Sequence, residues 1–241
     1  GLQFDDIAAG VLNGTPAREA GEGVAASPYA ITVGSLKANA NYTLDFIGSN
    51  LTITRRTLEV AADAQSKSYG DDDPALSYKV TGLQFTDTAA GVLSGALTRA
   101  AGEGVAGSPY PITVGALKAN ANYTLDFTGS TLTITPRTLH VTADAQSKIY
   151  GDSDPALTYK VTRSDLQYSD TEGVISGKLD RADGESVGSY PIGKGTLVVN
   201  SNYELDFSPA DLSITPRKLQ ITANGQAKVY GEPAGTTRYV L

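Results

Sequence analysis

Short segments in which hydrophobic and polar residues alternate run along most of the 241-residue chain. The stretch TLEVAAD (57–63) places Leu58, Val60 and Ala62 on one side and polar or small residues on the other. A two-residue period is that of a β-strand with one buried face. The same interpretation applies to AQSKSYG (64–70), ALSYKVTG (75–82), SPYPITVG (108–115), YTLDF (123–127) and TLTIT (131–135). The pattern therefore predicts about six short strands within a stretch of about 80 residues.

One segment departs from this pattern. TDTAAGVLSG (86–95) has Asp87, a residue type that caps helix N-termini, near its start and ends with Gly95, a residue type that terminates helices. We therefore expect a helix of one to two turns, capped by Asp87. Together with the strands it predicts a mostly β module, in which a mostly antiparallel sheet is covered by a small helix.

These elements return at a fixed spacing. The dipeptide Tyr-Gly occurs at 69–70, 150–151 and 230–231, and the motif Asn-Tyr-x-Leu-Asp-Phe occurs at 41–46, 122–127 and 202–207, so that both recur after 81 and then 80 residues. Residues 1–54 and 82–135 align without a gap and are identical at 42 of 54 positions. Self-similarity at a fixed period indicates a tandem repeat protein.

The repeat divides the chain into four parts. Residues 1–55 form the C-terminal part of a split module, 56–136 and 137–216 are complete modules, and 217–241 form the N-terminal part of a split module. Between the complete modules only Pro136 and Arg137 separate one strand from the next. Proline fixes its own φ and biases the preceding residue toward extended backbone, so we expect a semi-rigid, elongated array.

Composition narrows the possible function classes. The net charge of −7 and the isoelectric point of about 4.7 argue against nucleic acid as a partner. No apolar run is long enough for a membrane span, so membrane insertion is not expected. The absence of Cys excludes disulfides and thiolate metal sites, and the absence of Cys and Met together fits an extracellular or cell-surface location. No acid–base or nucleophile pair recurs, so neither an enzyme nor a cofactor is predicted.

The single histidine is a weak candidate for chemistry. His140 occupies the position that Glu59 and Gln220 hold in the other repeats, on the outward face of a strand. An isolated histidine on a polar strand face is expected to be exposed to solvent, and one histidine cannot build a catalytic triad with a recurring partner or a multi-histidine metal site.

The acidic turns YGDDDPAL and YGDSDPAL could offer oxygen ligands to Ca²⁺. Because Asp and Pro also favour turns, turn formation is the preferred interpretation, and a weak Ca²⁺ site is the alternative. The candidate ligands are Asp71, Asp73, Asp152 and Asp154.

Six tyrosines recur in two series. We expect their rings to pack at the edge of the core and their hydroxyls to form hydrogen bonds. Since aromatic rings can also stack on sugars, a glycan groove remains the alternative. The two series are Tyr69, Tyr150 and Tyr230, each before a glycine, and Tyr29, Tyr110 and Tyr190.

The motif RTLxVxADAQSKxYGDxDPAL, followed by NYxLDFxxxxLxITP, resembles the MBG and YDG-type repeat domains of large secreted bacterial proteins, the YGX type in particular. The resemblance covers essentially the whole chain. It implies β-grasp-like modules in tandem arrays on haemagglutinin-like or biofilm adhesins, and it carries no catalytic residues.

The two partial modules add up to one whole module. Tyr230 and Tyr239 are nine residues apart, as are Tyr69 and Tyr78, so the final segment keeps the spacing of an intact repeat. We predict that 217–241 of one subunit completes 1–55 of the next by strand addition, which gives a filament or adhesin stalk built from copies of itself. The predicted interface comprises Leu219, Ile221, Val229, Tyr230 and Tyr239 on one side and Leu2, Phe4, Tyr42, Leu44, Phe46, Leu51 and Ile53 on the other.

Two alternatives stay open at this point. The chain could be a window of a longer covalent repeat protein, and its function could be ligand binding, with host or matrix glycans or proteins as partners. Closure of the split module within one chain is disfavoured, because two stiff modules separate its two parts.

Overall fold

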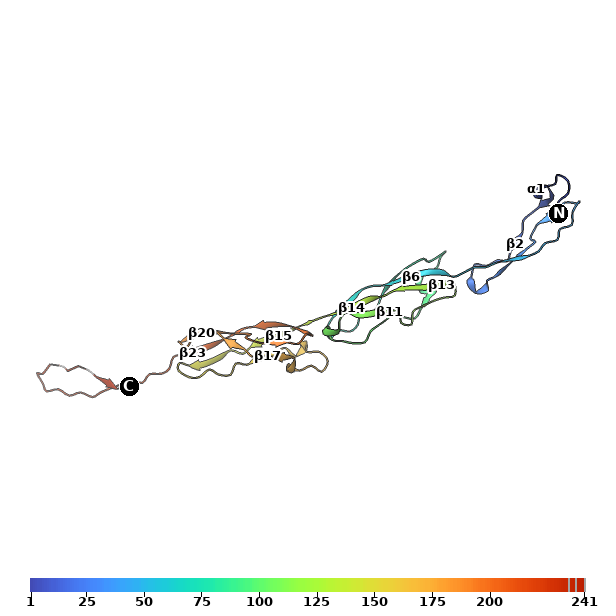
Figure 1. Cartoon of the computed structure of the whole chain (residues 1–241). Coiled ribbons are helices and arrows are strands. Elements are labelled where there is room, and N and C mark those ends of the chain that lie inside the picture. Colours follow the sequence, from blue (N-terminus) through green and yellow to red (C-terminus); the bar gives the residue numbers. More distant parts are fainter. Residues whose placement is uncertain (234, 237, 241) are drawn as a thin grey trace. The chain divides into compact units, whose positions relative to one another are not determined.

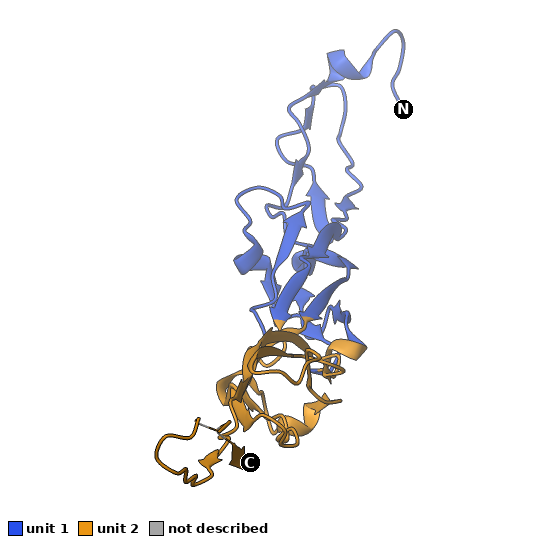
Figure 2. Ribbon diagram, turned by 90° about the vertical axis from the view of Figure 1, so that its left-hand side faces the viewer, with its two compact units in different colours: residues 1–67, 72–103, 107–134 blue, residues 68–71, 104–106, 135–241 orange. Residues whose placement is uncertain are grey.

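The computed structural model describes residues 1–233, 235–236 and 238–240 of the chain. The fold is mostly β and divides into two compact units (Figure 2). Unit 1 comprises residues 1–67, 72–103 and 107–134, and unit 2 comprises 68–71, 104–106 and 135–241. Among the described residues, no helix has the length and apolar character needed to cross a membrane.

Unit 1 begins with a region of very short elements. They are α1 (Ala8–Val11), β1 (Leu12–Asn13), β2 (Ala17–Arg18), the 3₁₀ turn η1 (Val24–Ala26), β3 (Tyr29–Thr32), β4 (Lys37–Ala38) and β5 (Ser49–Leu51). Strands β2, β3 and β5 form one sheet in the order β2-β3-β5, and β1 pairs with β4. Residues 42–47, which correspond to a strand in both complete repeats, form no strand here.

The first complete repeat supplies the rest of unit 1. Its elements are β6 (Arg56–Ala62), β7 (Gln65–Ser68), β8 (Tyr78–Thr81), α2 (Ala89–Val92), β9 (Leu93–Ser94), β10 (Thr98–Arg99), η2 (Val105–Gly107), β11 (Tyr110–Thr113), β12 (Lys118–Ala119), β13 (Tyr123–Thr128) and β14 (Ser130–Thr135). Six of its strands have at least four residues, which matches the predicted number, and three more have two residues each.

These strands form two main sheets instead of the single sheet expected from the sequence. One has the order β13-β6-β8 and the other the order β10-β11-β14-β7; Figure 1 shows β6 beside β13 and β11 beside β14. Strand β6 runs parallel to β13, with Leu58 opposite Leu125, and antiparallel to β8. The parallel pair was not evident from the sequence, because alternation defines faces and not partners.

The core of this repeat contains residues from both sheets. Leu58 and Val60 of β6, Ile112 of β11 and Leu132 of β14 are all almost completely buried. Each such side chain contributes about 1.5–3 kcal/mol when it leaves water. The predicted inward faces of the strands are thereby confirmed.

The predicted helix exists but is shorter than expected, and its cap is a different residue. Helix α2 has four residues, and its N-cap is Thr88, whose Oγ1 accepts a hydrogen bond from the Gly91 amide at 3.2 Å. The predicted cap, Asp87, instead accepts a hydrogen bond from the Tyr123 hydroxyl at 2.6 Å. The prediction failed because both residues are good caps and only the tertiary contact to Tyr123 distinguishes them.

Unit 2 repeats the same architecture. Its elements are β15 (Arg137–Ala143), β16 (Gln146–Ile149), β17 (Tyr159–Val161), η3 (Arg163–Asp165), η4 (Glu172–Val174), β18 (Ile175–Ser176), β19 (Asp180–Arg181), β20 (Gly188–Gly193), β21 (Val198–Val199), β22 (Tyr203–Ser208), β23 (Ala210–Thr215), β24 (Thr222–Ala223) and β25 (Tyr239–Val240). The sheets are β17-β15-β22, β16-β23-β20-β19, β18-β21 and β24-β25.

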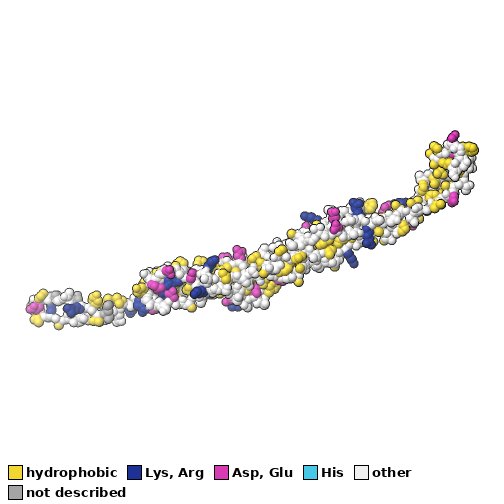
Figure 3. Space-filling view, viewed as in Figure 1, with side chains coloured by type: hydrophobic (Ala, Val, Ile, Leu, Met, Phe, Trp, Pro, Cys, Tyr) yellow, Lys and Arg dark blue, Asp and Glu magenta, His cyan; other side chains and the backbone are white. Residues whose placement is uncertain are grey.

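The pairing in unit 2 reproduces that of unit 1. Strand β15 runs parallel to β22, with Arg137 opposite Tyr203 and Val141 opposite Phe207. Strand β16 also runs parallel, to β23, with Ile149 opposite Thr215. The helix of the first repeat is replaced by the 3₁₀ turn η4, capped by Thr171. On the face displayed in Figure 3, side chains of both charge signs are interspersed.

Candidate functional site

A buried tyrosine, Tyr69, is the centre of a polar and aromatic cluster in unit 2. Only 6% of its surface is exposed. Its hydroxyl donates to Asp170 Oδ2 at 3.0 Å, and its ring meets the rings of Tyr168 and Tyr203 edge-on, each with a centroid distance of 5.4 Å. The Tyr203 hydroxyl donates to the same Asp170 oxygen at 2.8 Å. Two tyrosine hydroxyls thus share one carboxylate.

Burial and the shared carboxylate change the acidity of both hydroxyls. Burial, reinforced by the hydrogen bond to Asp170, raises the pKa of Tyr69. Burial also raises the pKa of Tyr203 to about 12, although the hydrogen bond from the Gln167 amide opposes the shift. Both tyrosines therefore remain neutral donors at physiological pH, and the cluster has a structural character.

The backbone of the Tyr69 loop is fastened at two further points. The Tyr69 amide donates to the Thr135 carbonyl at 2.9 Å. Arg137 Nε donates to the Tyr69 carbonyl at 3.0 Å, and Arg137 Nη2 pairs with Asp71 at 2.8 Å. The residues that contact Tyr69 or Gly70 are here named the tyrosine seat. They are Thr135, Arg137, Gln167, Tyr168, Asp170, Asn202 and Tyr203.

The glycine after the tyrosine is required by this geometry. Gly70 has φ of +87°, and a Cβ at this position would lie 2.2 Å from Cγ of Gln167. Both the left-handed backbone and the close approach exclude larger residues. The left-handed backbone recurs at Gly151 (φ +88°) and Gly231 (φ +93°), so it accounts for the recurring Tyr-Gly dipeptide, whereas the close approach to Gln167 is specific to Gly70.

A second loop anchors to the same region. The side-chain Oδ1 of Asn202 accepts a hydrogen bond from the Val105 amide at 2.9 Å, and its backbone carbonyl accepts one from the Arg137 amide at 3.0 Å. In unit 1, Asn122 makes the same pair of bonds, to the Val24 amide at 2.9 Å and the Arg56 amide at 3.0 Å. The motif Asn-Tyr-x-Leu-Asp-Phe therefore uses its asparagine as a bridge and its tyrosine in the seat.

The other two Tyr-Gly dipeptides form the same turn but are not buried. Tyr150 is 51% exposed and Tyr230 is fully exposed. Tyr150 keeps only part of a seat, since its amide donates to the Thr215 carbonyl at 2.8 Å and Arg217 Nε donates to its carbonyl at 2.7 Å. The expectation of packed rings thus holds for Tyr69 and fails for Tyr150 and Tyr230.

The second tyrosine series does pack as expected. Tyr29 and Tyr110 are buried and Tyr190 is half-buried. The hydroxyl of Tyr29 donates to the Gly23 carbonyl at 2.7 Å, and an arginine lies over each ring at 5.5–5.9 Å from the centroid. These rings are therefore parts of the module's packing.

The acidic turns, weighed above as weak Ca²⁺ sites, are engaged by basic side chains. The almost fully buried Lys67 Nζ lies 2.7 Å from Asp73 and 2.5 Å from Glu103, and Arg99 contacts the same two carboxylates. Hydrogen bonding to Arg99, opposed by burial and supported by Lys67, lowers the pKa of Asp73 to about 2.

Unit 2 repeats this network with Lys148, Asp154, Arg181 and Glu185. Hydrogen bonds to Arg181, which has the larger effect, and to Lys148 lower the pKa of Asp154 to about 2. Asp71 and Asp152 pair with Arg137 and Arg217. The described part of the chain holds no group of three or more His, Asp or Glu arranged for a metal ion. Asp71, Asp73 and Asp154 thus connect turns to residues of strands, and Asp152 connects its turn to Arg217, between β23 and β24.

His140 is exposed, as predicted, but it has acidic neighbours. Its Nδ1 lies 2.7 Å from Asp165 Oδ2 and its Nε2 lies 3.4 Å from Asp206 Oδ2. The hydrogen bond to Asp165, which outweighs desolvation, raises the pKa of His140. This pair was not evident from the sequence, because Asp165 lies 25 residues away, in the 3₁₀ turn η3.

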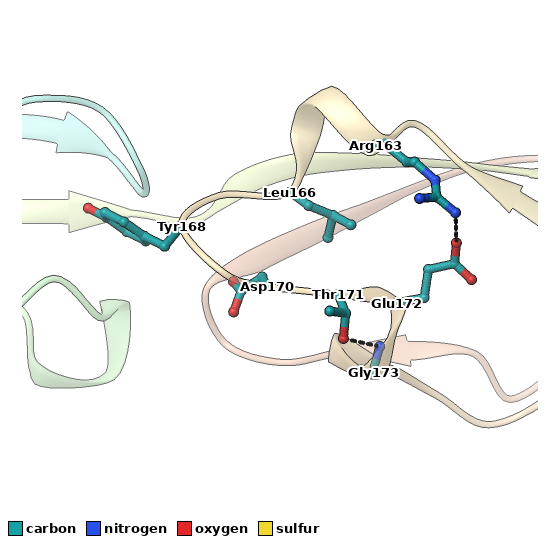
Figure 4. Close-up of a pocket in the computed structure, with 7 residues that line it drawn as sticks. All are labelled: Arg163, Leu166, Tyr168, Asp170, Thr171, Glu172 and Gly173. Carbon is teal, nitrogen blue, oxygen red and sulfur yellow. Dashed lines mark hydrogen bonds and ion pairs between the residues drawn. The ribbon is translucent and has the colours of Figure 1, made fainter.

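A pocket of about 580 Å³ lies beside the loop 163–173 of unit 2 (Figure 4). Arg163 and Glu172 form an ion pair there at 3.8 Å, and Figure 4 shows the Tyr168 ring pointing away from that pair. The lining residues are Arg163, Leu166, Tyr168, Asp170, Thr171, Glu172 and Gly173. Of its two carboxylates, Asp170 accepts hydrogen bonds from Tyr69 and Tyr203, and Glu172 pairs with Arg163.

The predicted interface residues fall on exposed or half-buried positions. The exposed ones are Leu2, Phe4, Leu51, Leu219, Ile221, Val229, Tyr230 and Tyr239, and the half-buried ones are Tyr42, Leu44, Phe46 and Ile53.

Three residues around Tyr69 were not predicted as site residues from the sequence: Asp170, Gln167 and Asn202. A signal for them exists: Gln-aromatic-x-Asp recurs at 3–6, 84–87 and 167–170.

Comparison with known families adds one finding. The family model of the MBG domain (YGX type) matches residues 58–133 and 139–213, each within one of the two repeats that the sequence predicts as complete. MBG repeat domains are of a structural, adhesin type and are not enzymes. No curated protein and no solved structure is detectably similar to the chain. Because the two matches cover more than half of its residues, the chain belongs to the MBG domain (YGX type) family.

Proposed function

We propose that this protein is an extracellular structural repeat protein that forms a filament or adhesin stalk, in which residues 217–241 of one subunit complete the 1–55 part of the next. The observation that carries the proposal is a pair of exposed hydrophobic faces whose counterparts elsewhere in the chain are buried against each other.

The first face lies in residues 217–223. Leu219 and Ile221 are 69% and 54% exposed, whereas their counterparts Leu139 and Val141 are completely buried in β15. The corresponding residues of β6, Leu58 and Val60, are also buried. Burying the two exposed side chains would contribute about 1.5–3 kcal/mol each.

The second face lies in residues 42–54. In both complete repeats the strand that begins with the recurring tyrosine pairs in parallel with the first strand of the repeat. Residues 42–47 form no such strand, and Leu51 is exposed where Leu132 and Leu212 are fully buried. An unpaired strand segment with an apolar face is a template for strand addition.

The register of the joint follows from the intact repeats. Since Arg137 lies opposite Tyr203 and Val141 opposite Phe207, we expect Arg217 opposite Tyr42 and Ile221 opposite Phe46 of the next subunit. A heterologous contact of this kind propagates instead of closing, which gives a filament. The proposal includes a β-grasp-like topology for the completed repeat, supported by the parallel pairing of its first strand.

The proposal can be tested with the full chain by light scattering and negative-stain microscopy. The variant Ile221→Asp places a charge on the face proposed to be buried, and we expect it to abolish filaments that the unmodified chain forms. The matched control is Gln220→Asp, one residue earlier on the opposite face of the strand, which we expect to assemble normally. Monomers from the unmodified chain, or filaments from Ile221→Asp, would overturn the proposal.

A further inference from the structure

Unit 1 contains a small open pocket that corresponds to the tyrosine seat of unit 2. Its volume is about 110 Å³. It is lined by Glu22, Ile53, Thr54, Arg56, Gln84, Phe85, Asp87, Asn122 and Tyr123.

The lining repeats the seat residue by residue. Thr54 and Arg56 correspond to Thr135 and Arg137, which hold the backbone of Tyr69. The segment Gln84-Phe85-Thr86-Asp87 corresponds to Gln167-Tyr168-Ser169-Asp170. Asn122 and Tyr123 correspond to Asn202 and Tyr203. Every seat residue thus has its counterpart here, with one aromatic exchanged for another.

The pocket also has the geometry of the occupied seat. The Tyr123 hydroxyl donates to Asp87 at 2.6 Å and accepts from the Gln84 amide at 3.0 Å; the matching distances around Tyr203 are 2.8 and 2.9 Å. Phe85 has φ of +54° and Tyr168 has φ of +53°. An aromatic residue in the left-handed region is unfavourable, and such strain concentrates at binding sites.

Phe85 is 89% exposed, whereas Tyr168 is 62% exposed and its ring contacts Tyr69. The strained backbone therefore presents an aromatic ring to solvent in unit 1, and to solvent and a tyrosine in unit 2. What distinguishes the two places is the presence of a Tyr-Gly turn.

The chain also carries a Tyr-Gly turn without a seat. Tyr230 is fully exposed, and its turn is already formed, because the Glu232 amide donates to the Val229 carbonyl at 3.1 Å, as the Asp71 amide donates to the Ser68 carbonyl. Gly231 has φ of +93°, close to the +87° of Gly70. Little backbone ordering would be needed for this turn to bind.

We infer that the pocket of unit 1 binds the Tyr230-Gly231 turn of a second copy of this chain. The inference rests on the proposed function, since it takes the register of the completed repeat as its starting point. In that register Val229 lies beside Thr54 of the second copy, as Ile149 lies beside Thr215. The Tyr230 amide then reaches the Thr54 carbonyl, and the ring enters between Phe85 and Tyr123.

An ion pair comes with the turn. Arg137 binds Asp71 in the occupied seat, and Arg217 binds Asp152. The same position beside Arg56 is taken by Glu232 of the incoming turn, so Arg56 and Glu232 pair between subunits. Arg56 is conspicuous because it lines the pocket, whereas the adjacent Arg55 does not.

The same docking step would complete the partial seat of Tyr150. Its missing half corresponds to Gln3, Phe4, Asp6 and Tyr42. There the Tyr42 hydroxyl donates to Asp6 at 2.8 Å and accepts from the Gln3 amide at 2.9 Å, and Phe4 has φ of +53°. One contact between subunits therefore buries two tyrosines, one on each side of the completed repeat.

A charge exchange in the full chain tests the inference. Arg56→Glu and Glu232→Arg should each raise the concentration at which half of the protein is assembled about tenfold, because each removes a charge-assisted pair and places like charges together. The double variant should recover most of this loss. Arg55→Glu, the same charge change one residue away from the pocket, should leave assembly unchanged.

Crosslinking locates the tyrosine. A photoreactive benzoylphenylalanine at position 230, in a mixture of ¹⁴N and ¹⁵N chains, should give mixed-isotope crosslinks to residues 54–56 and 84–87. Crosslinks confined to single-isotope peptides would overturn the assignment to a second copy.

The outcomes separate the two proposals. If filaments form and depend on Ile221 but not on Tyr230 or on the 56–232 pair, strand completion stands and the tyrosine joint is wrong. If the unmodified chain forms no filaments, both fall.

Discussion

The hydroxyl of Tyr69 donates to the carboxylate of Asp170 at 3.0 Å, across 101 residues of chain, and the Tyr203 hydroxyl shares that carboxylate. This contact fastens the Tyr-Gly turn inside unit 2. It gives a role to the Tyr-Gly dipeptide, which recurs in the sequence after 81 and then 80 residues. It also provides the occupied example against which an equivalent open pocket can be recognised.

Removing the Tyr69 hydroxyl should destabilise unit 2 measurably. We expect Tyr69→Phe to lower the free energy of unfolding by about 1.5 kcal/mol, since one hydrogen bond to a charged acceptor is lost. Tyr69→Ala should lower it by about 3 kcal/mol, because the buried ring is lost as well. Urea denaturation followed by near-ultraviolet circular dichroism measures both. Tyr150→Phe, at a half-exposed ring, is the control and should change little at protein concentrations below those at which the chain assembles. Equal effects at the two positions would contradict the assignment.

Replacing the buried lysine of the ion network should be costly. In Lys67→Met the carboxylates of Asp73 and Glu103 lose their ammonium partner and keep the ion pair with Arg99. We expect a loss of about 2 kcal/mol in the free energy of unfolding. The control is Lys79→Met, since Lys79 is largely exposed and its Nζ lies 3.8 Å from Asp63 Oδ1, a longer distance than in the Lys67 ion pairs. A loss below about 0.5 kcal/mol is expected there, as for other surface pairs.

Acid should weaken the fold within a defined pH window. The pKa values of Asp73 and Asp154 are about 2 in the folded state and near 3.8 when unperturbed. Because the folded-state pKa is depressed, the stabilisation is present above about pH 4 and is lost as the pH falls toward 2. The melting temperature should therefore decline over that interval. In Asp73→Asn/Asp154→Asn it should be lower at pH 7 and decline less between pH 4 and 2; an unchanged slope would contradict the assignment.

His140 should titrate above its ordinary range. Since His140 is the only histidine, its imidazole signals in a proton NMR titration are unambiguous. Asp165 raises the pKa of His140, so the stabilisation from this pair is fully present below about pH 6.5 and is lost as the pH rises through the folded-state pKa. Asp165→Asn should return the pKa toward 6.5. A wild-type pKa at or below 6.5 would show that the ion pair does not form in solution.

Much of the module could be predicted from the sequence. The alternation of Leu58 and Val60, and of Leu132 and Ile134, identifies buried faces that the structure confirms. The fixed period and the motif around Tyr69-Gly70 identify the repeat and its family. These features were accessible because a two-residue period and a recurring motif are local properties of the chain.

Other features required the three-dimensional arrangement. Asp87 and Thr88 are equally plausible caps, and only the hydrogen bond from Tyr123 assigns Asp87 elsewhere. From the sequence, the acidic turns could be oxygen-rich loops that bind Ca²⁺. The structure shows that Lys67 and Arg99 form ion pairs with Asp73. In each case the deciding partner lies tens of residues away, where local pattern carries no information about proximity.

By itself, the sequence determined the strand faces, the period and the residues that recur. The tertiary structure alone decided that one Tyr-Gly turn is buried, that a second is half-exposed, and that a third is fully exposed. Identical dipeptides have different environments because burial depends on whether Asp170 and its neighbours are folded against the turn. Sequence identity fixes what each turn can bind, and spatial neighbours fix whether it is bound.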